Sequence, residues 1–278
     1  STTAMDNQLH NQIVNFIWGI ADDCLRDVYG RGKYRDVILP MTVIRRLDAM
    51  LGDSKQKVLD MRKKLDDAKI DNQWPALCNA AGQAFCNASP FLLRDLTSRS
   101  KKQTLKADFE AYLDGFSPNV QEILDKFKFR NQIATMVDAD ILGAVIEKFI
   151  SPDINLSPAP VYKDNEKTIL RHPGLDNHGM GTIFEELIRK FNEENNEEKV
   201  VVTETEDNTT VFEDVVKDNT ADITDVIAVS LPEVDETKAV VVDETTVDET
   251  EETTEEVTEE ISEETTIEEV TESETVAE

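Results

Sequence analysis

Basic side chains gather around the first glycine-rich break in the chain, where "GRGKYRD" occupies residues 30–36. Arginine and lysine beside a glycine turn suit contact with phosphate, because they neutralise charge without reading a base sequence. A second basic group lies near residue 100. The candidate contacts for DNA phosphate or for a neighbouring subunit are Arg26, Arg31, Lys33, Tyr34, Arg35, Arg45, Arg46, Lys101 and Lys102.

Acidic residues lie among these bases and leave an alternative open, a solvated surface whose charges pair with one another. They are Asp22, Asp23, Asp27, Asp36 and Asp48. Arg45 and Arg46 also follow two apolar residues in an expected core helix, so a structural role is open for at least one of them.

Residue patterns for metal binding or covalent catalysis do not accompany the bases. The histidines are His10, His172 and His178. His172 and His178 are expected in a loop, six residues apart, without a cysteine or a helical acid to complete a metal site. The cysteines are Cys24, Cys78 and Cys86, and without C-x-x-C spacing they predict reduced, mostly packed thiols in a cytosolic protein. The sequence therefore predicts no catalytic residue and no metal ligand, and it favours binding over catalysis.

Apolar residues recur at helical spacing through most of the first 198 residues, and signals for strands are weak. The expected helices cover residues 6–29, 35–51, 53–69, 103–114, 118–129 and 138–150, with a short helix within 87–99 and a last one from about 177 to 198. Asn177 or Asp176 is expected to cap the last helix, and Glu185 and Glu186 to pair with Arg189 and Lys190. We expect an all-α fold, a bundle of about six to eight helices.

Charge separates the chain into two parts. Residues 1–198 hold 26 Lys and Arg against 30 Asp and Glu, whereas residues 199–278 hold 3 Lys, no Arg and 28 Asp and Glu. The second part has too few large apolar side chains to offset the entropy of ordering, so a disordered acidic tail is expected. No apolar run has the length of a membrane span, so no membrane association and a cytoplasmic location are expected.

Two segments resemble one known family. Residues 15–51, "NFIWGIADDCLRDVYGRGKYRDVILPMTVIRRLDAML", resemble the N-terminal helical domain of the modification (M) subunit of type I restriction–modification systems. Residues 176–198, "DNHGMGTIFEELIRKFNEENNEE", resemble the helix that joins this domain to the catalytic domain in that family. The resemblance covers about residues 6–198. It implies three parts: a helical domain over 1–175, a joining helix over 176–198 and an unmatched acidic tail over 199–278.

The family's reaction is methyl transfer from S-adenosylmethionine to the N6 atom of adenine in DNA. That reaction needs a glycine-rich loop for the cofactor and an N-P-P-[FY] type loop for the flipped base. "GRG" at 30–32, "GMG" at 179–181 and "ASPF" at 88–91 fit neither loop. We therefore predict no cofactor-binding residue in this chain, which alone is expected to be inactive as a methyltransferase.

The resemblance leads to two hypotheses. In the first, the chain is an M subunit, or a truncated fragment of one, whose partners are DNA, the specificity subunit and the restriction subunit, with a second M subunit as a further candidate. In the second, the chain is a non-catalytic module that docks on a restriction–modification complex and presents an acidic arm that mimics DNA. In either case the acidic tail is expected to weaken DNA binding by repulsion, more at low salt.

Overall fold

The computed structural model describes residues 2–97 and 102–201, and the side chains of residues 6–97 and 104–193. The chain forms two compact units. Among the described residues, the first unit contains 2–53 and 89–201, and the second contains 54–88. The predicted acidic tail lies outside the described residues from residue 202 onward.

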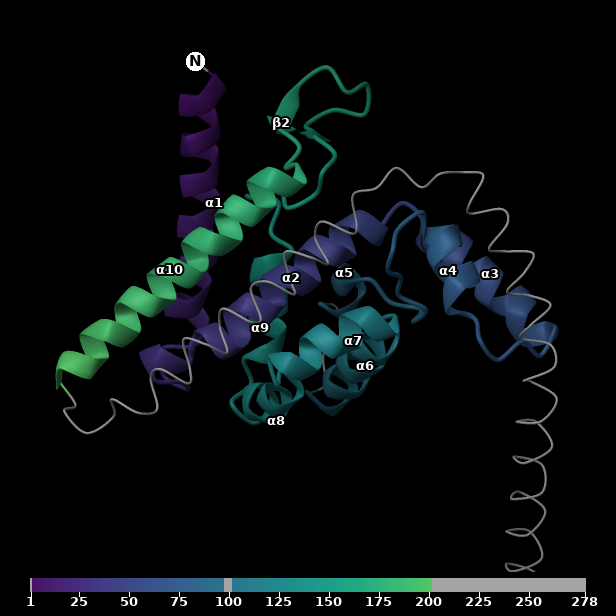
Figure 1. Ribbon diagram of the computed structural model, residues 1–278, viewed down its shortest axis with the longest axis horizontal. Coiled ribbons are helices and arrows are strands. Elements are labelled where there is room, and N and C mark those ends of the chain that lie inside the picture. Colours follow the sequence, from purple (N-terminus) through teal and green to yellow (C-terminus); the bar gives the residue numbers. More distant parts are fainter. Residues whose placement is uncertain (1, 98–101, 202–278) are drawn as a thin grey trace, which may run out of the picture. The chain divides into compact units, whose positions relative to one another are not determined.

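The first unit is built almost entirely from helices (Figure 1). They are α1 (Thr2–Cys24), the 3₁₀ turn η1 (Arg31–Lys33), α2 (Arg35–Leu51), α5 (Leu93–Leu96), α6 (Lys102–Asp114), α7 (Pro118–Lys126), α8 (Arg130–Asp138), α9 (Leu142–Phe149) and α10 (Asn177–Val201). The prediction of an all-α fold is confirmed. The part of the chain that the structure describes holds ten α-helices, more than the six to eight expected.

Helix α2 shows why the apolar spacing predicted its bounds. Val37, Ile38, Ile44 and Leu47 lie at steps that place them on one face, and all four are fully buried. The helix runs from Arg35 to Leu51, as the pattern predicts. It packs against α1, α9 and α10 in the middle of the first unit.

Residues in the left-handed conformation interrupt two of the predicted helical segments. The predicted helix over 138–150 is wrong in its first turn, because Asp140 has a φ of 61° and separates α8 from α9. Lys128, with a φ of 53°, ends α7 in the same way before α8 begins. A positive φ is costly for residues other than glycine, so neither turn has a strong sequence signal.

A small hairpin precedes the last helix. Strand β1 (Val161–Tyr162) pairs antiparallel with β2 (Leu170–His172). The Asp164 carboxylate organises the connecting loop by accepting hydrogen bonds from the backbone N–H groups of Thr168 and Ile169. Such short strands give little apolar alternation, and the sequence analysis did not predict them.

Helix α10 lies against α1, α2 and η1 along much of its length (Figure 1). Asp176 caps it, accepting a hydrogen bond from the Gly179 N–H at 2.7 Å, which decides between the two predicted caps. The buried face carries Ile183, Phe184, Leu187 and Phe191. The last helix therefore packs against the first two, although more than a hundred residues separate them.

The second unit is a pair of helices, α3 (Lys55–Asp67) and α4 (Trp74–Ala81), which pack on each other. Lys55 is buried, and its ammonium donates to the backbone oxygen of Asn87 at 3.2 Å and to its side-chain oxygen at 3.1 Å. Arg62 donates to the backbone oxygen of Ala88. These bonds hold the segment after α4 against α3.

Candidate nucleic-acid and subunit interface

The structure separates the first group of predicted contact residues into an exposed set and an inward set. Arg26, Arg31 and Lys33 are exposed. The inward set consists of Tyr34, Arg35 and Arg46, which are buried, and Arg45, which is half-buried. We call the exposed set the η1 basic surface. These three are the residues of the group that a phosphate could reach directly.

The η1 basic surface is formed by the turn between α1 and α2. After α1 the backbone continues as a turn, in which the Tyr29 N–H donates to the Leu25 carbonyl at 2.9 Å. The Lys33 N–H then donates to the Gly30 carbonyl at 2.9 Å and closes the single turn of η1. Helix α10 packs against this turn. The bases therefore stand on a turn that the last helix supports.

Charges of both signs surround the buried Tyr34 ring below this surface. Burial raises the pKa of the Tyr34 phenol, and Asp22 raises it further. Arg31 and Arg26 act in the opposite direction and lower it. The arginines therefore share their neighbourhood with an acidic residue, which keeps the local field smaller than three bases alone would give.

A second acid lies on the other side of η1. Burial raises the pKa of the Asp36 carboxyl, while Lys33 and Arg35 lower it. The Arg35 guanidinium is buried and donates to the side-chain oxygen of Asn192 in α10 at 3.5 Å. Arg35 thus helps to hold the last helix, α10, against α2.

Arg45 is directed into the fold and not towards solvent. Its Nε–H donates to the Phe149 carbonyl at 3.2 Å, at the end of α9, and its Nη1 lies 2.9 Å from Asp48 Oδ2. The Arg45–Asp48 ion pair is an example of the alternative in which the acids pair with the bases. Two nitrogens of its guanidinium therefore have internal acceptors, and the Arg45 side chain is 23% exposed.

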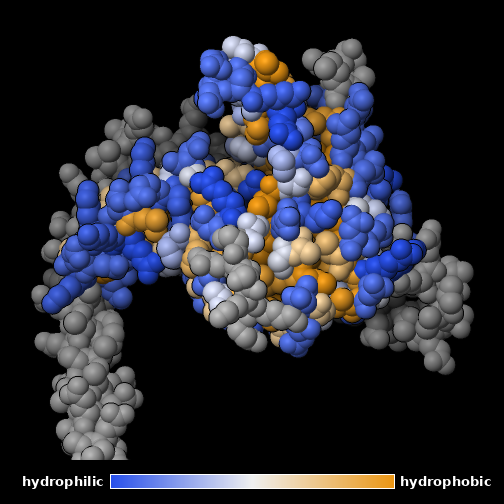
Figure 2. Space-filling model, turned by 180° about the vertical axis from the view of Figure 1, so that it is seen from behind, coloured by the Kyte–Doolittle hydropathy of each residue, from blue (hydrophilic) through white to orange (hydrophobic). Residues whose placement is uncertain are grey.

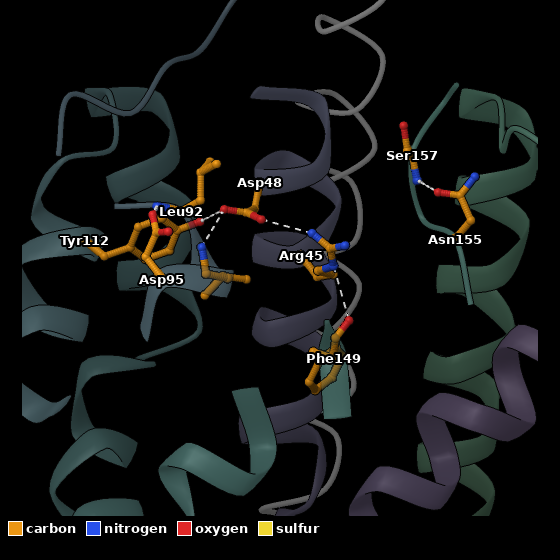
Figure 3. A network of polar contacts seen from close by, with 9 residues as sticks. Arg45, Asp48, Leu92, Asp95, Tyr112, Phe149, Asn155 and Ser157 are labelled. Carbon is orange, nitrogen blue, oxygen red and sulfur yellow. Dashed lines mark hydrogen bonds and ion pairs between the residues drawn. The ribbon is translucent and has the colours of Figure 1, made fainter. Parts of the chain in front are cut away.

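Asp48 is the centre of a buried polar network (Figure 3). Its Oδ1 accepts hydrogen bonds from the Tyr112 hydroxyl at 2.9 Å and from the Leu93 N–H at 3.0 Å. The Leu93 bond anchors the first residue of α5, while Asp95 accepts from the Leu92 N–H at 2.8 Å. A buried carboxylate is tolerated only when it is paired and bonded in this way.

Arg46 is the most deeply buried of the predicted contact residues, with 1% of its surface exposed. Its guanidinium donates to the carbonyls of Leu156 and Leu175 at 2.7 Å each, and to the Asn177 side-chain oxygen at 2.8 Å. Burial lowers the pKa of Arg46 to about 10, and Asp176 opposes that effect. Arg46 therefore stays charged at neutral pH and ties α2 to the segment that leads into α10.

The second basic group is only partly described. Arg99 and Lys101 lie outside the described residues. Lys102 begins α6, but its side chain lies outside the described side chains, and Lys106 is half-buried. The role of Lys101 and Lys102 as contacts therefore stays a prediction.

The glycines of the "GRG" and "GMG" segments lie at the starts of helices, and His172 contacts the backbone. Gly30 precedes η1, whereas Gly179 and Gly181 lie in the first turns of α10. The His172 ring nitrogen lies 2.7 Å from the Pro152 carbonyl oxygen. Within residues 2–97 and 102–201, no group of three His, Cys, Asp or Glu side chains is placed to hold a metal ion.

On the face in Figure 2, hydrophilic and hydrophobic residues lie side by side. Among the described side chains, three large apolar residues are exposed: Val161 (37%), Ile169 (53%) and Leu170 (50%), all on the hairpin. None of the described helices has the combination of length and apolar character needed to cross a bilayer.

Comparison with known proteins supports one family. Neither the curated proteins nor the solved structures contain a match to this chain. A family model described as the HsdM N-terminal domain matches residues 13–149. Those residues begin in α1 and end with α9, so the match includes the η1 basic surface and the Asp48 network. The match identifies residues 13–149 as an HsdM N-terminal domain, which is the N-terminal domain of the M subunit of type I restriction–modification methyltransferases.

Proposed function

We propose that the chain supplies the helical domain of a type I M subunit, and that the η1 basic surface contacts the phosphates of bound DNA. The family match over residues 13–149 carries this proposal. Of the seven predicted contact residues between Arg26 and Arg46, only Arg26, Arg31 and Lys33 are exposed. Such contacts would position the domain on DNA without specifying a base sequence.

The distribution of charge favours weak, salt-dependent contact. Asp22 raises the pKa of Tyr34, and Lys33 lowers the pKa of Asp36, so acids lie close to the bases and offset part of the positive field. Each phosphate that a protein neutralises adds about 0.9 to the slope of log affinity against log salt. A surface of three bases should therefore contribute a slope of at most about 3.

A variant with Arg26→Gln, Arg31→Gln and Lys33→Gln tests the surface. Its affinity for a fluorescent DNA duplex should fall relative to the unmodified chain, measured by anisotropy over a range of salt. Its salt slope should be smaller by about 1 to 3. Because these side chains are exposed, the stability of the fold should change little.

The matched control removes the same charge from another exposed place. Lys57, Lys63 and Lys64 are exposed on α3, and a variant with all three changed to Gln has the same net charge as the first variant. Its salt slope should match that of the unmodified chain. If the two triple variants lose affinity and slope equally, net charge explains binding and the η1 basic surface has no special role.

We also propose the specificity and restriction subunits of a type I system as partners, with α10 as the helix that leads towards the methyltransferase domain of an M subunit. The packing of α10 on α1 and α2 supports such a role, because it gives the helix a fixed direction. A pull-down with an assembled type I complex tests partner binding. Calorimetry with S-adenosylmethionine tests the expected lack of cofactor uptake, which saturable heat would contradict.

A further inference from the structure

Two of the three cysteines lie side by side in the second unit. The Cys78 thiol donates to the Cys86 sulfur, and the two Sγ atoms are 3.4 Å apart. Cys78 belongs to the last turn of α4, and Cys86 follows in the segment that Lys55 and Arg62 hold against α3. Neither cysteine is in a disulfide in the structure. Their separation of eight residues has no motif, which is why the sequence analysis did not pair them.

The backbone between them already makes the reversal that a cross-link needs. Gly82 ends α4 in the left-handed conformation, with a φ of 70°. The Gly82 N–H donates to the Asn79 carbonyl and the Gln83 N–H donates to the Cys78 carbonyl, which closes the end of the helix. A disulfide requires a sulfur separation of about 2.05 Å. The two Sγ atoms must therefore approach by about 1.4 Å to form the bond.

We propose that Cys78 and Cys86 form a reversible intramolecular disulfide when the protein meets hydrogen peroxide. The Cys78 sulfur attacks one peroxide oxygen, the O–O bond breaks, and water leaves with the Cys78 proton, which gives a sulfenic acid. The Cys86 sulfur then attacks the Cys78 sulfur, the S–O bond breaks, and a second water leaves with the Cys86 proton. Each sulfur loses one electron, and the peroxide gains two.

The order of the two steps follows from exposure. Cys78 is partly exposed, whereas Cys86 has 0% of its surface exposed, so a dissolved oxidant reaches Cys78 first. The hydrogen bond with Cys78 raises the pKa of the Cys86 thiol, burial raises it further, and Lys55 opposes both effects. Cys86 therefore keeps its proton while Cys78 reacts, and it must lose that proton as it attacks the Cys78 sulfenic acid.

Peptide mapping of the full chain tests the proposal directly. Trypsin releases residues 70–94 as one peptide, because no Lys or Arg lies between Lys69 and Arg94, and both cysteines are in it. After treatment with peroxide and alkylation of the remaining thiols, this peptide should be lighter than the reduced, unalkylated peptide by the mass of two hydrogen atoms. Dithiothreitol should restore two alkylation sites. The thiol count of the denatured chain should fall from three to one.

Matched variants separate the pair from general thiol oxidation. Cys24→Ser should still form the cross-link, because Cys24 lies in α1 and is not part of the pair. Cys86→Ser should leave Cys78 as a sulfenic acid, which dimedone traps. Peroxide treatment in concentrated urea should slow cross-linking, because unfolding separates the thiols. Separate oxidation of Cys78 and Cys86, or equal rates in folded and unfolded chains, would overturn the proposal.

Discussion

The Arg46 guanidinium donates a hydrogen bond to the side-chain oxygen of Asn177 at 2.8 Å, and so joins the middle of α2 to the first residue of α10. The same guanidinium bonds the carbonyls of Leu156 and Leu175, one on each side of the hairpin in the sequence. One buried side chain therefore fixes the start of the last helix and both ends of the segment before it.

The variant Arg46→Met should destabilise the first unit by about 3–5 kcal/mol, because it leaves buried acceptors without their charged donor. Urea unfolding followed by circular dichroism measures the change. Arg26→Met, at an exposed position, should change the free energy of unfolding by about 0.5 kcal/mol or less. Equal stability of the two variants would show that the Arg46 bonds contribute little.

Tyr112 should make stability depend on pH on the alkaline side. Burial raises its pKa well above the ordinary value, and Asp48 raises it further. A phenol with a raised folded pKa contributes its full stability below the unfolded value of about 10, and loses it as the pH rises further. The stability difference between the unmodified chain and Tyr112→Phe should therefore narrow as the pH rises above about 10.

At neutral pH, Tyr112→Phe should cost about 1.5–3 kcal/mol, because a hydrogen bond to a charged acceptor is lost. Chemical unfolding of both proteins at a series of pH values measures this loss of stability and its change with rising pH. A stability difference that stays constant up to pH 11 would contradict the argument from ionisation.

Phe191→Ala should loosen α10 from α1. The Phe191 ring is buried and its centroid lies 4.8 Å from that of Trp18, while the Lys190 ammonium lies 5.2 Å from the same indole. Loss of a buried phenylalanine costs about 3–5 kcal/mol. In a Trp74→Phe background the emission reports Trp18 alone, since the chain has two tryptophans, and its maximum should shift to longer wavelength.

Lys190→Met is the companion variant for this contact. It keeps an apolar chain over the indole but removes the cation and its bond to Asn15, so the loss of stability should be well below that of Phe191→Ala. An unchanged Trp18 emission in Phe191→Ala would show that α10 stays packed against α1 without the Trp18–Phe191 contact.

Gly174→Ala should destabilise the segment that precedes α10. A Cβ atom at this position would lie 2.2 Å from the Pro158 carbonyl oxygen, so the backbone would have to move. We expect a loss of about 1–3 kcal/mol, measured by thermal unfolding. Gly181→Ala is the matched control, because a Cβ there meets nothing within 4 Å and alanine favours a helix. Similar stability of both variants would contradict the close approach.

The sequence predicts the long helices better than the short ones, for a physical reason. Helix α2 has apolar residues on one face over 17 residues, and its predicted bounds agree with the structure. Helices α4 and α8, of 8 and 9 residues, were not predicted, and the predictions for the equally short α7 and α9 extended several residues too far. A short helix gives two turns of periodicity, which turn residues on either side can obscure.

The candidate interface was predicted as a set of residue types, without knowledge of which side chains turn inward. The acceptors of Arg46 lie 110, 129 and 131 residues away in the sequence, so no local pattern could identify them. The ion pairs on α10 differ from the predicted ones, in which Glu185 and Glu186 pair with Arg189 and Lys190, for a similar reason. Arg189 pairs with Glu186 and Glu193, while Lys190 contacts Asn15 and Trp18 of α1.

The contact between α10 and η1 has a mechanical consequence. A rotation of that helix about its own axis would disturb both its packing on the turn with Arg31 and Lys33 and the Arg35–Asn192 bond, which joins it to the first residue of α2. A rotation imposed at the C-terminal end of α10 would then change the orientation of these two cations, so the helix would couple motion at its end to the η1 basic surface.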